Sequence, residues 1–211
     1  MKISRHRLLL VSVLAFAAIF LASPGLGEER EQSAGVEHEQ HKLADQPASF
    51  KRSEANYKVP EVTLVRQDGS KARFPGELDD GRPVILTFIF TSCTTVCPVI
   101  NAVFSSVQQK LGKEREKVHM VSISIDPDYD TPAHLADYAR SFKAGPQWQF
   151  YTGTPEAVTA IQTAFAVYRG DKMNHIPVIL LRAAPGKTWV RLDGVGIASP
   201  DDVIREYRNL K

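Results

Sequence analysis

The chain has 211 residues, 26 basic and 24 acidic side chains, and a formal net charge of +2. Its basic residues form no stripe of the kind that a phosphate backbone requires, so the composition excludes nucleic-acid binding.

Residues 1–27 have the pattern of an export signal. Lys2, Arg5 and Arg7 precede an apolar run over residues 8–22, and small residues follow up to Gly27. The run is shorter than the roughly 20 residues that span a bilayer. This favours cleavage after Gly27, with an uncleaved inner-membrane anchor over residues 8–22 as the alternative. Removing the signal lowers the formal net charge from +2 to −1. We therefore expect an exported, periplasmic protein.

Residues 28–58 are rich in Glu, Gln, Ser, Ala and Lys and poor in aromatic side chains. Such a segment buries too little apolar surface to offset chain entropy, so it predicts a flexible linker. We interpret His38 and His41, which lie in it, as solvated rather than metal-binding residues. The folded domain is then expected over residues 59–211, an ordinary size for one domain.

Strand and helix patterns alternate along this domain. Strands are expected at residues 62–66 and 73–74 (a hairpin), 84–90, 118–125, 148–151, 176–182 and 188–192. Helices are expected at residues 98–111, from Pro132, from Pro155 to about residue 167, and from Ser199. The run 84–90 is apolar on both faces, as in a central strand. This order predicts an α/β protein with a thioredoxin-like three-layer fold, in which helices flank a central mixed sheet.

The two cysteines, Cys93 and Cys97, lie four residues apart directly after the strand 84–90. Residues at this spacing share one face of a helix. The junction of a strand end and a helix start is where ligands bind in open α/β sheets, and a helix N-terminus lowers a thiol pKa. A purely structural disulfide would close a very short loop and constrain the unfolded chain little. A redox pair and a soft metal site both remain open.

Three segments carry a resemblance to a known family. They are TSCTTVCP (residues 91–98), SIDPDYDTPAHLADYA (residues 124–139), and a lone His175 before the last hairpin. Together they resemble the Sco/SenC family, thioredoxin-fold copper chaperones for the copper site in subunit II of cytochrome c oxidase. The resemblance covers residues 59 to 209. It implies that Cys93, Cys97 and His175 bind a copper ion and that the cysteines are a redox-active pair able to form a disulfide. It also implies the partners: subunit II of cytochrome c oxidase or a similar copper acceptor, and other periplasmic copper donors or thiol reductases.

The residue chemistry agrees with this expectation, because thiolates select Cu(I) and an imidazole also accommodates Cu(II). In a thioredoxin-like fold, the Xaa-Pro dipeptide before the last hairpin lies beside the cysteine pair. We therefore expect Pro177 to be cis and His175 to lie within reach of the thiols. Asn174-His175-Ile176-Pro177 departs from the Asp-His-Ser/Thr of many family members and brings the site closer to ordinary thioredoxins.

Four other residues are secondary candidates for the metal site. Asp126, Asp128 and Asp130 lack the Gly and Glu of a calcium-binding loop. We interpret them as capping or orienting carboxylates, with Asp126 the candidate nearest the metal. Met173 is a candidate thioether ligand, although a packing or surface role is the preferred interpretation. His119 and His134 are interpreted as structural.

Two other functions would use the same cysteines. A thiol–disulfide oxidoreductase would act on a partner protein and would not need His175. A thiol peroxidase would use the spacing of Thr94 and Cys97 together with an arginine, for which Arg182 and Arg191 are candidates. The leading hypothesis is a periplasmic copper chaperone, a metal carrier rather than primarily an enzyme.

Overall fold

The computed structural model describes residues 50–194 and 197–210. In this part of the chain eight strands form one sheet in the order β1-β8-β7-β4-β5-β6-β2-β3. The strands are β1 (Lys51–Ala55), β2 (Val62–Arg66), β3 (Lys71–Phe74), β4 (Val84–Ile89), β5 (His119–Ser124), β6 (Trp148–Thr152), β7 (Val178–Arg182) and β8 (Trp189–Asp193). The helices are α2 (Val96–Leu111), α3 (Pro132–Ser141), α4 (Pro155–Ala164) and α5 (Pro200–Arg208), with short 3-10 helices η1 (Gly76–Leu78), η2 (Gly112–Lys117) and η3 (Lys172–Asn174).

The sheet is mixed, as predicted. β4, β5 and β6 are parallel to one another, whereas β7 is antiparallel to β4 and the remaining pairs are antiparallel. Every residue of β4 and of β5 is buried. Both strands lie inside the sheet and are covered on both faces, which is why their sequences show no polar alternation.

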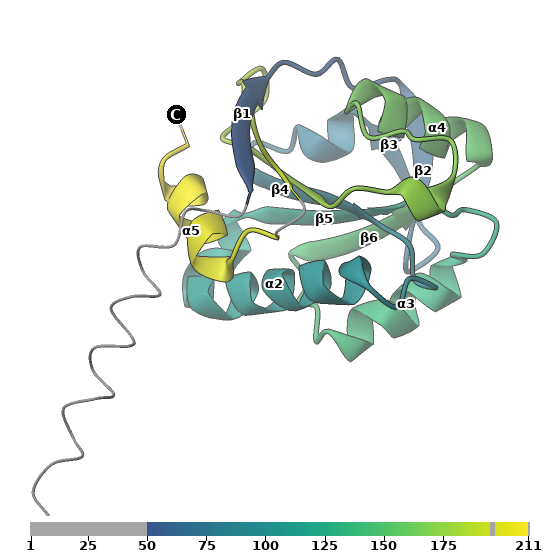
Figure 1. The fold of residues 1–211 in the computed structure, drawn as a ribbon, viewed down its shortest axis with the longest axis horizontal. Helices are drawn as coiled ribbons and strands as arrows, with labels where there is room; N and C mark the ends of the chain where they lie inside the picture. The colour runs from purple at the N-terminus through teal and green to yellow at the C-terminus, as the bar shows by residue number, and fades with distance from the viewer. Residues whose placement is uncertain (1–49, 195–196, 211) are drawn as a thin grey trace, which may run out of the picture. The chain divides into compact units, whose positions relative to one another are not determined.

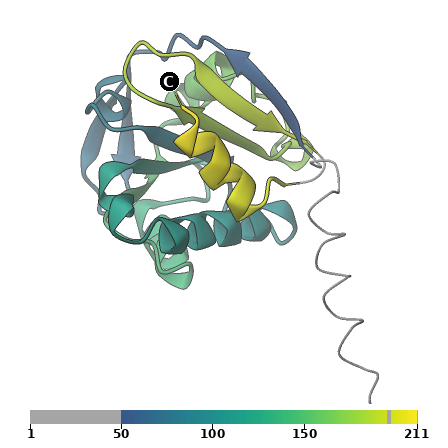
Figure 2. The ribbon, with the colours of Figure 1, turned by 90° about the vertical axis from the view of Figure 1, so that its left-hand side faces the viewer.

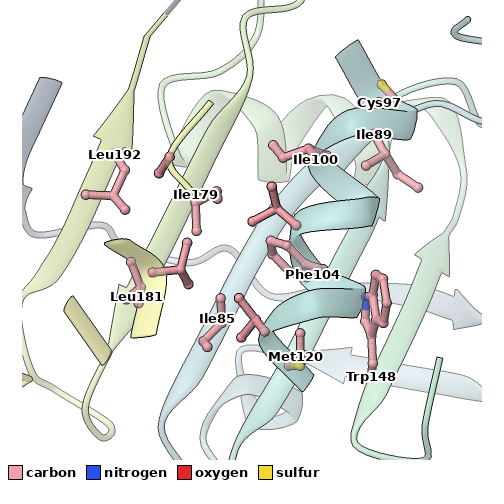
Figure 3. Packing of buried hydrophobic residues seen from close by; sticks show 14 of the residues in the cluster. Ile85, Ile89, Cys97, Ile100, Phe104, Met120, Trp148, Ile179, Leu181 and Leu192 are labelled. Carbon is pink, nitrogen blue, oxygen red and sulfur yellow. The ribbon is translucent and has the colours of Figure 1, made fainter. Parts of the chain in front are cut away.

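Helices cover both faces of the sheet (Figure 1). The buried apolar side chains form two separate cores. On one face α2, α3 and α5 contribute side chains such as Phe104, Leu135 and Val203 to a core that also contains Cys97 (Figure 3). On the other face α4 contributes Ile161 to the second core. Figure 2 shows α2 and α5 on the same side of the sheet, where they contact each other. The predicted three-layer arrangement is confirmed.

Local sequence signals set most helix boundaries. Thr131, Thr154 and Ser199 each accept a backbone hydrogen bond with the side chain at a helix N-terminus, and a proline follows each of them. Gly112 follows α2 with a φ of +54°, a conformation that suits glycine. The differences from the sequence are small: α2 begins two residues earlier than predicted, and β7 begins at Val178.

The prediction of a flexible linker over residues 28–58 is wrong for its last part. Residues Lys51–Ala55 form β1, which pairs antiparallel with β8, so the fold begins before residue 59. Phe50 packs against one core and Tyr57 against the other. The sequence KRSEA has little strand propensity, and it is the exposed edge of β8 that supplies the missing hydrogen-bond partners.

Among the described residues, no helix combines the length and the apolar character needed to cross a bilayer. The predicted signal or anchor over residues 1–27, His38 and His41 all lie outside the described residues.

Candidate metal centre

Three strand ends build the site at one edge of the sheet. β4 and β5 run in parallel and end there, so Cys93 and Asp130, which follow them, lie at the same edge. β7 is antiparallel to β4, with Ile179 opposite Thr87, and therefore begins at this edge. The hydroxyl of Thr87 donates to the carbonyl oxygen of Val178 at 2.8 Å and fixes the start of β7. This arrangement brings the loop that carries His175 to the cysteines.

Cys93 and Cys97 are both free thiols at the start of α2. Cys93 is 8% exposed and Cys97 is 1% exposed. Thr95 precedes α2 but makes no side-chain capping bond, and its hydroxyl lies 3.5 Å from the Cys93 sulfur instead. The backbone N–H of Cys97 also donates to Cys93. The sulfur of Cys93 thus takes the place of a helix-capping oxygen.

These contacts give the two thiols opposite pKa shifts. Burial by itself raises the pKa of Cys93, but hydrogen bonds from the N–H of Cys97 and from Thr95 outweigh it and bring the pKa to about 7. Burial raises the pKa of Cys97 to about 12. Cys93 is therefore the thiol that ionises near neutral pH, and Cys97 is the protonated inner thiol.

The imidazole of His175 is oriented by the backbone of β4. Its Nε2 lies 3.0 Å from the carbonyl oxygen of Phe88. Because a carbonyl oxygen only accepts, Nε2 carries the proton and Nδ1 keeps its lone pair. Nδ1 is buried and has no hydrogen-bond partner. Burial also lowers the pKa of His175, so the ring is neutral at pH 7. A neutral ring with one free nitrogen is the form that binds a metal.

Cys93 and His175 line one cavity of about 270 Å³, together with Thr95, Lys172 and Met173. The histidine and the two thiols were predicted to lie close together, and the fold brings His175 and Cys93 to one cavity. In the described part of the chain, however, no three His, Cys, Asp or Glu side chains converge closely enough to hold a metal ion. The three-ligand set of Cys93, Cys97 and His175 stays a prediction.

The prediction of a cis Pro177 is wrong. Among the described residues the cis peptide bond is Phe74–Pro75, and Ile176–Pro177 is trans. The Xaa-Pro dipeptide alone does not fix the isomer, because trans is intrinsically favoured and only tertiary contacts can reverse that preference.

Asp130 holds the two strand ends together, a role that the sequence did not single out. Its buried carboxylate accepts hydrogen bonds from the hydroxyl and the backbone N–H of Thr91, the latter at 3.1 Å, and from the Ser124 hydroxyl at 2.5 Å. It therefore ties Thr91, two residues after β4, to the end of β5 and fixes the loop that carries Cys93. The feature of the sequence that could have indicated this role is the position of Asp130 between a strand and the helix cap at Thr131.

Asp126, predicted to be the carboxylate nearest the metal, reaches the cavity only through a lysine. Its Oδ2 lies 2.5 Å from Nζ of Lys172. The ammonium group of Lys172 also lies 5.7 Å from the centre of the Phe90 ring. The ion pair fastens η3, which precedes His175, to the end of β5. A role for Asp126 beside a metal stays a prediction.

The two histidines interpreted as structural lie away from the cavity. His119 is buried at the amino end of β5, with Nε2 3.3 Å from the hydroxyl of Tyr151. His134 lies on α3, with Nδ1 2.6 Å from the carbonyl oxygen of Tyr129. Neither is among the residues that line the cavity.

The arginines that a peroxidase would need have other partners. Arg182 lies opposite Val84 at the far end of β4 and binds the carbonyl oxygen of Leu78 and the carboxylate of Asp79. Arg191 binds Asp193 and backbone and hydroxyl oxygens nearby. Neither lines the cavity with Cys93, so the geometry gives the peroxidase hypothesis no support.

The sheet is mixed and covered on both faces. A cysteine pair follows its central strand β4, and a histidine precedes the antiparallel strand β7. These features define a thioredoxin-like protein in which a thiol and an imidazole line one cavity. The SCO1/SenC family model matches residues 51–191, and the chain belongs to this family.

Relatives and solved structures agree with this assignment. The SCO1 protein homolog of Bacillus subtilis is 29% identical over 162 residues, which cover 73% of this chain and 83% of the relative. The structure of BsSco, described as a member of the Sco family of cytochrome c oxidase assembly proteins with a disulfide switch, has a TM-score of 0.63 at 29% identity. That match covers 74% of this chain and 95% of BsSco. Bradyrhizobium japonicum ScoI with copper bound has a TM-score of 0.59 at 25% identity, covering 72% of this chain and 98% of ScoI.

Proposed function

We propose that this protein is an exported copper carrier that delivers copper to subunit II of cytochrome c oxidase, with Cys93, Cys97 and His175 as the ligands. The observation that carries the proposal is the free Nδ1 of His175. This atom is buried and has no hydrogen-bond partner. His175 and Cys93 line the same cavity. A buried nitrogen without a hydrogen-bond partner is costly unless it binds something.

The donor set fits copper. Two sulfurs and one imidazole nitrogen suit a soft cation such as Cu(I), and the carboxylates nearby, which would suit a hard cation, are engaged in other contacts. The pKa of Cys93, about 7, supplies one thiolate at neutral pH, and binding would displace the proton of Cys97. Since the three ligands do not converge, binding all of them requires the loop of His175 and the start of α2 to approach each other.

The oxidation state of the cysteines would act as a switch in this function. Copper is the cargo, and the reduced pair holds it. A disulfide between Cys93 and Cys97 removes both thiolates and prevents binding. Two solved relatives support this scheme: BsSco, described as having a disulfide switch, and ScoI, with copper bound. The N-terminal pattern supports work in the periplasm, with residues 8–22 as a membrane tether if the signal is retained.

Anaerobic copper titration of the reduced protein tests the proposal. We expect one copper ion per chain, with sulfur-to-copper charge-transfer absorption in the Cu(II) form. Cys93→Ser and Cys97→Ser should each abolish the band. A Cu(II) complex without any sulfur band in the unaltered protein would exclude the site.

A thiol–disulfide oxidoreductase is the second candidate, favoured by the divergent pKa values of the thiols, which suit an attacking Cys93 and a resolving Cys97. His175→Ala separates the two functions. In a copper carrier it should weaken copper binding by more than the roughly 10- to 100-fold that loss of a group supporting a ligand costs, whereas in an oxidoreductase the dithiol activity survives and copper is irrelevant. His134→Ala, at an exposed histidine, is the matched control.

A further inference from the structure

Met173 is an exposed methionine at the cavity that Cys93 and His175 line. Its side chain is 74% exposed, the highest value among the exposed large apolar side chains of the described residues. The preferred interpretation from the sequence was a packing or surface role. Such exposure excludes a role in packing the core and leaves a thioether at the surface, where hydrophobic burial does not explain it.

Hydrogen bonds hold Met173 in place on the turn that precedes His175. The carboxylate of Asp171 accepts from the backbone N–H of Met173 at 2.8 Å. The N–H of His175 donates to the carbonyl oxygen of Lys172 at 3.1 Å. The ion pair of Lys172 with Asp126 fastens the same turn to the end of β5. The backbone of Met173 is therefore held at the cavity by these bonds, and its side chain is exposed there.

The core and the cavity offer different sulfur donors. Cys97 is 1% exposed, packs in the core and does not line the cavity. Met173 lines the cavity and is largely exposed, so its thioether is accessible from solvent. A thioether is a soft, neutral donor that binds Cu(I) without adding charge, and it needs no deprotonation.

We propose that Met173 is a further copper ligand, whose thioether closes the coordination sphere on the solvent side of the cavity. The inference rests on the proposed copper function. Met173 lies two residues from His175 on the same turn, so one segment of the chain presents both the thioether and the imidazole to an ion in the cavity.

X-ray absorption at selenium tests this assignment directly. The full chain carrying selenomethionine is reduced and loaded with one equivalent of Cu(I) without oxygen. We expect a copper neighbour at selenium that disappears in Met173→Leu, which keeps the size and apolar character of the side chain. It should persist in Met120→Leu, the matched control, because Met120 is fully buried on β5. Transfer of Cu(I) to a chelator should be about tenfold faster in Met173→Leu.

The outcomes separate this inference from the proposed function. If copper is bound with its sulfur absorption but selenium has no copper neighbour, the Met173 assignment is wrong and the copper function stands. A copper neighbour that survives Met173→Leu also overturns the assignment. If neither protein binds copper, the proposed function fails, and the assignment fails with it.

Discussion

The Nε2 atom of His175 lies 3.0 Å from the carbonyl oxygen of Phe88, two residues before the end of the apolar run that leads to the cysteines. A histidine far along the sequence is thus oriented by the backbone of the strand that positions Cys93. The contact fixes the tautomer and leaves Nδ1 as the free nitrogen.

This tautomer can be observed in solution. We expect long-range ¹H–¹⁵N spectra to show a neutral Nε2–H imidazole for His175 at pH 7, because burial lowers its pKa. Adding Cu(I) should shift the Nδ1 signal more than the Nε2 signal. A protonated ring at pH 7, or an Nδ1–H tautomer, would contradict the geometry.

The two thiols should react at different pH values. With limiting iodoacetamide at neutral pH, we expect mass spectrometry to find the label on Cys93, with a rate that rises around a pKa of about 7. Cys97, whose pKa burial raises to about 12, should react slowly even in Cys93→Ser. In denaturant both thiols should react alike, which provides the control. Equal labelling of the folded protein would exclude the asymmetry.

Acid should destabilise the fold through buried histidines. Burial lowers the pKa of His119, even though Asp80 lies 3.7 Å and Glu77 4.0 Å from its ring. The unfolded chain therefore binds more protons below about pH 6.5, so this contribution is present above that pH and is lost as the pH falls.

Chemical unfolding at several pH values measures this effect. From about pH 7 to about pH 5 the free energy of unfolding should fall less in His119→Gln than in the unaltered protein. The free energy of unfolding of His119→Gln should still fall somewhat as the pH is lowered, because burial lowers the pKa of His175 as well. If the free energy of unfolding falls as much with pH in His119→Gln as in the unaltered protein, His119 does not cause the acid destabilisation.

Asp130 should matter for stability far more than its neighbour Asp128. Asp130→Ala leaves the groups of Thr91 and Ser124 without their acceptor, and we expect it to lower the free energy of unfolding by about 3 kcal/mol. Asp128 is exposed, so Asp128→Ala should change stability by less than about 0.5 kcal/mol. Denaturant titration measures both. Equal effects would mean that the network does not hold the strand ends.

The strand β1 gives a further test of where the fold begins. A chain that starts at residue 59 lacks the pairing with β8 and also Tyr57, whose ring centre lies 5.0 Å from that of Phe165. We expect its free energy of unfolding to be about 3 kcal/mol lower than that of a chain starting at residue 50. Equal stability of the two chains would mean that residues 50–58 are a linker after all.

The sequence by itself determined the central strand and the helix starts, because these depend on local signals. The uninterrupted apolar run at β4 requires cover on both faces. Thr131, Thr154 and Ser199 each cap a helix through a bond from the residue three positions further on. The cysteine pair was also visible, since its spacing and its place after a strand are local features.

The tertiary structure decided what depends on distant partners. KRSEA becomes a strand only because β8 offers an unpaired edge, and Ile176–Pro177 is trans although the motif suggested cis. Asp130 differs from Asp126 and Asp128 only in the fold, where two strand ends converge on its carboxylate. His175 meets the carbonyl oxygen of Phe88 because β7 runs antiparallel to β4. Local spacing carries no information about such pairings, so the histidine, the carboxylate and the methionine of the site were placed only by the folded chain.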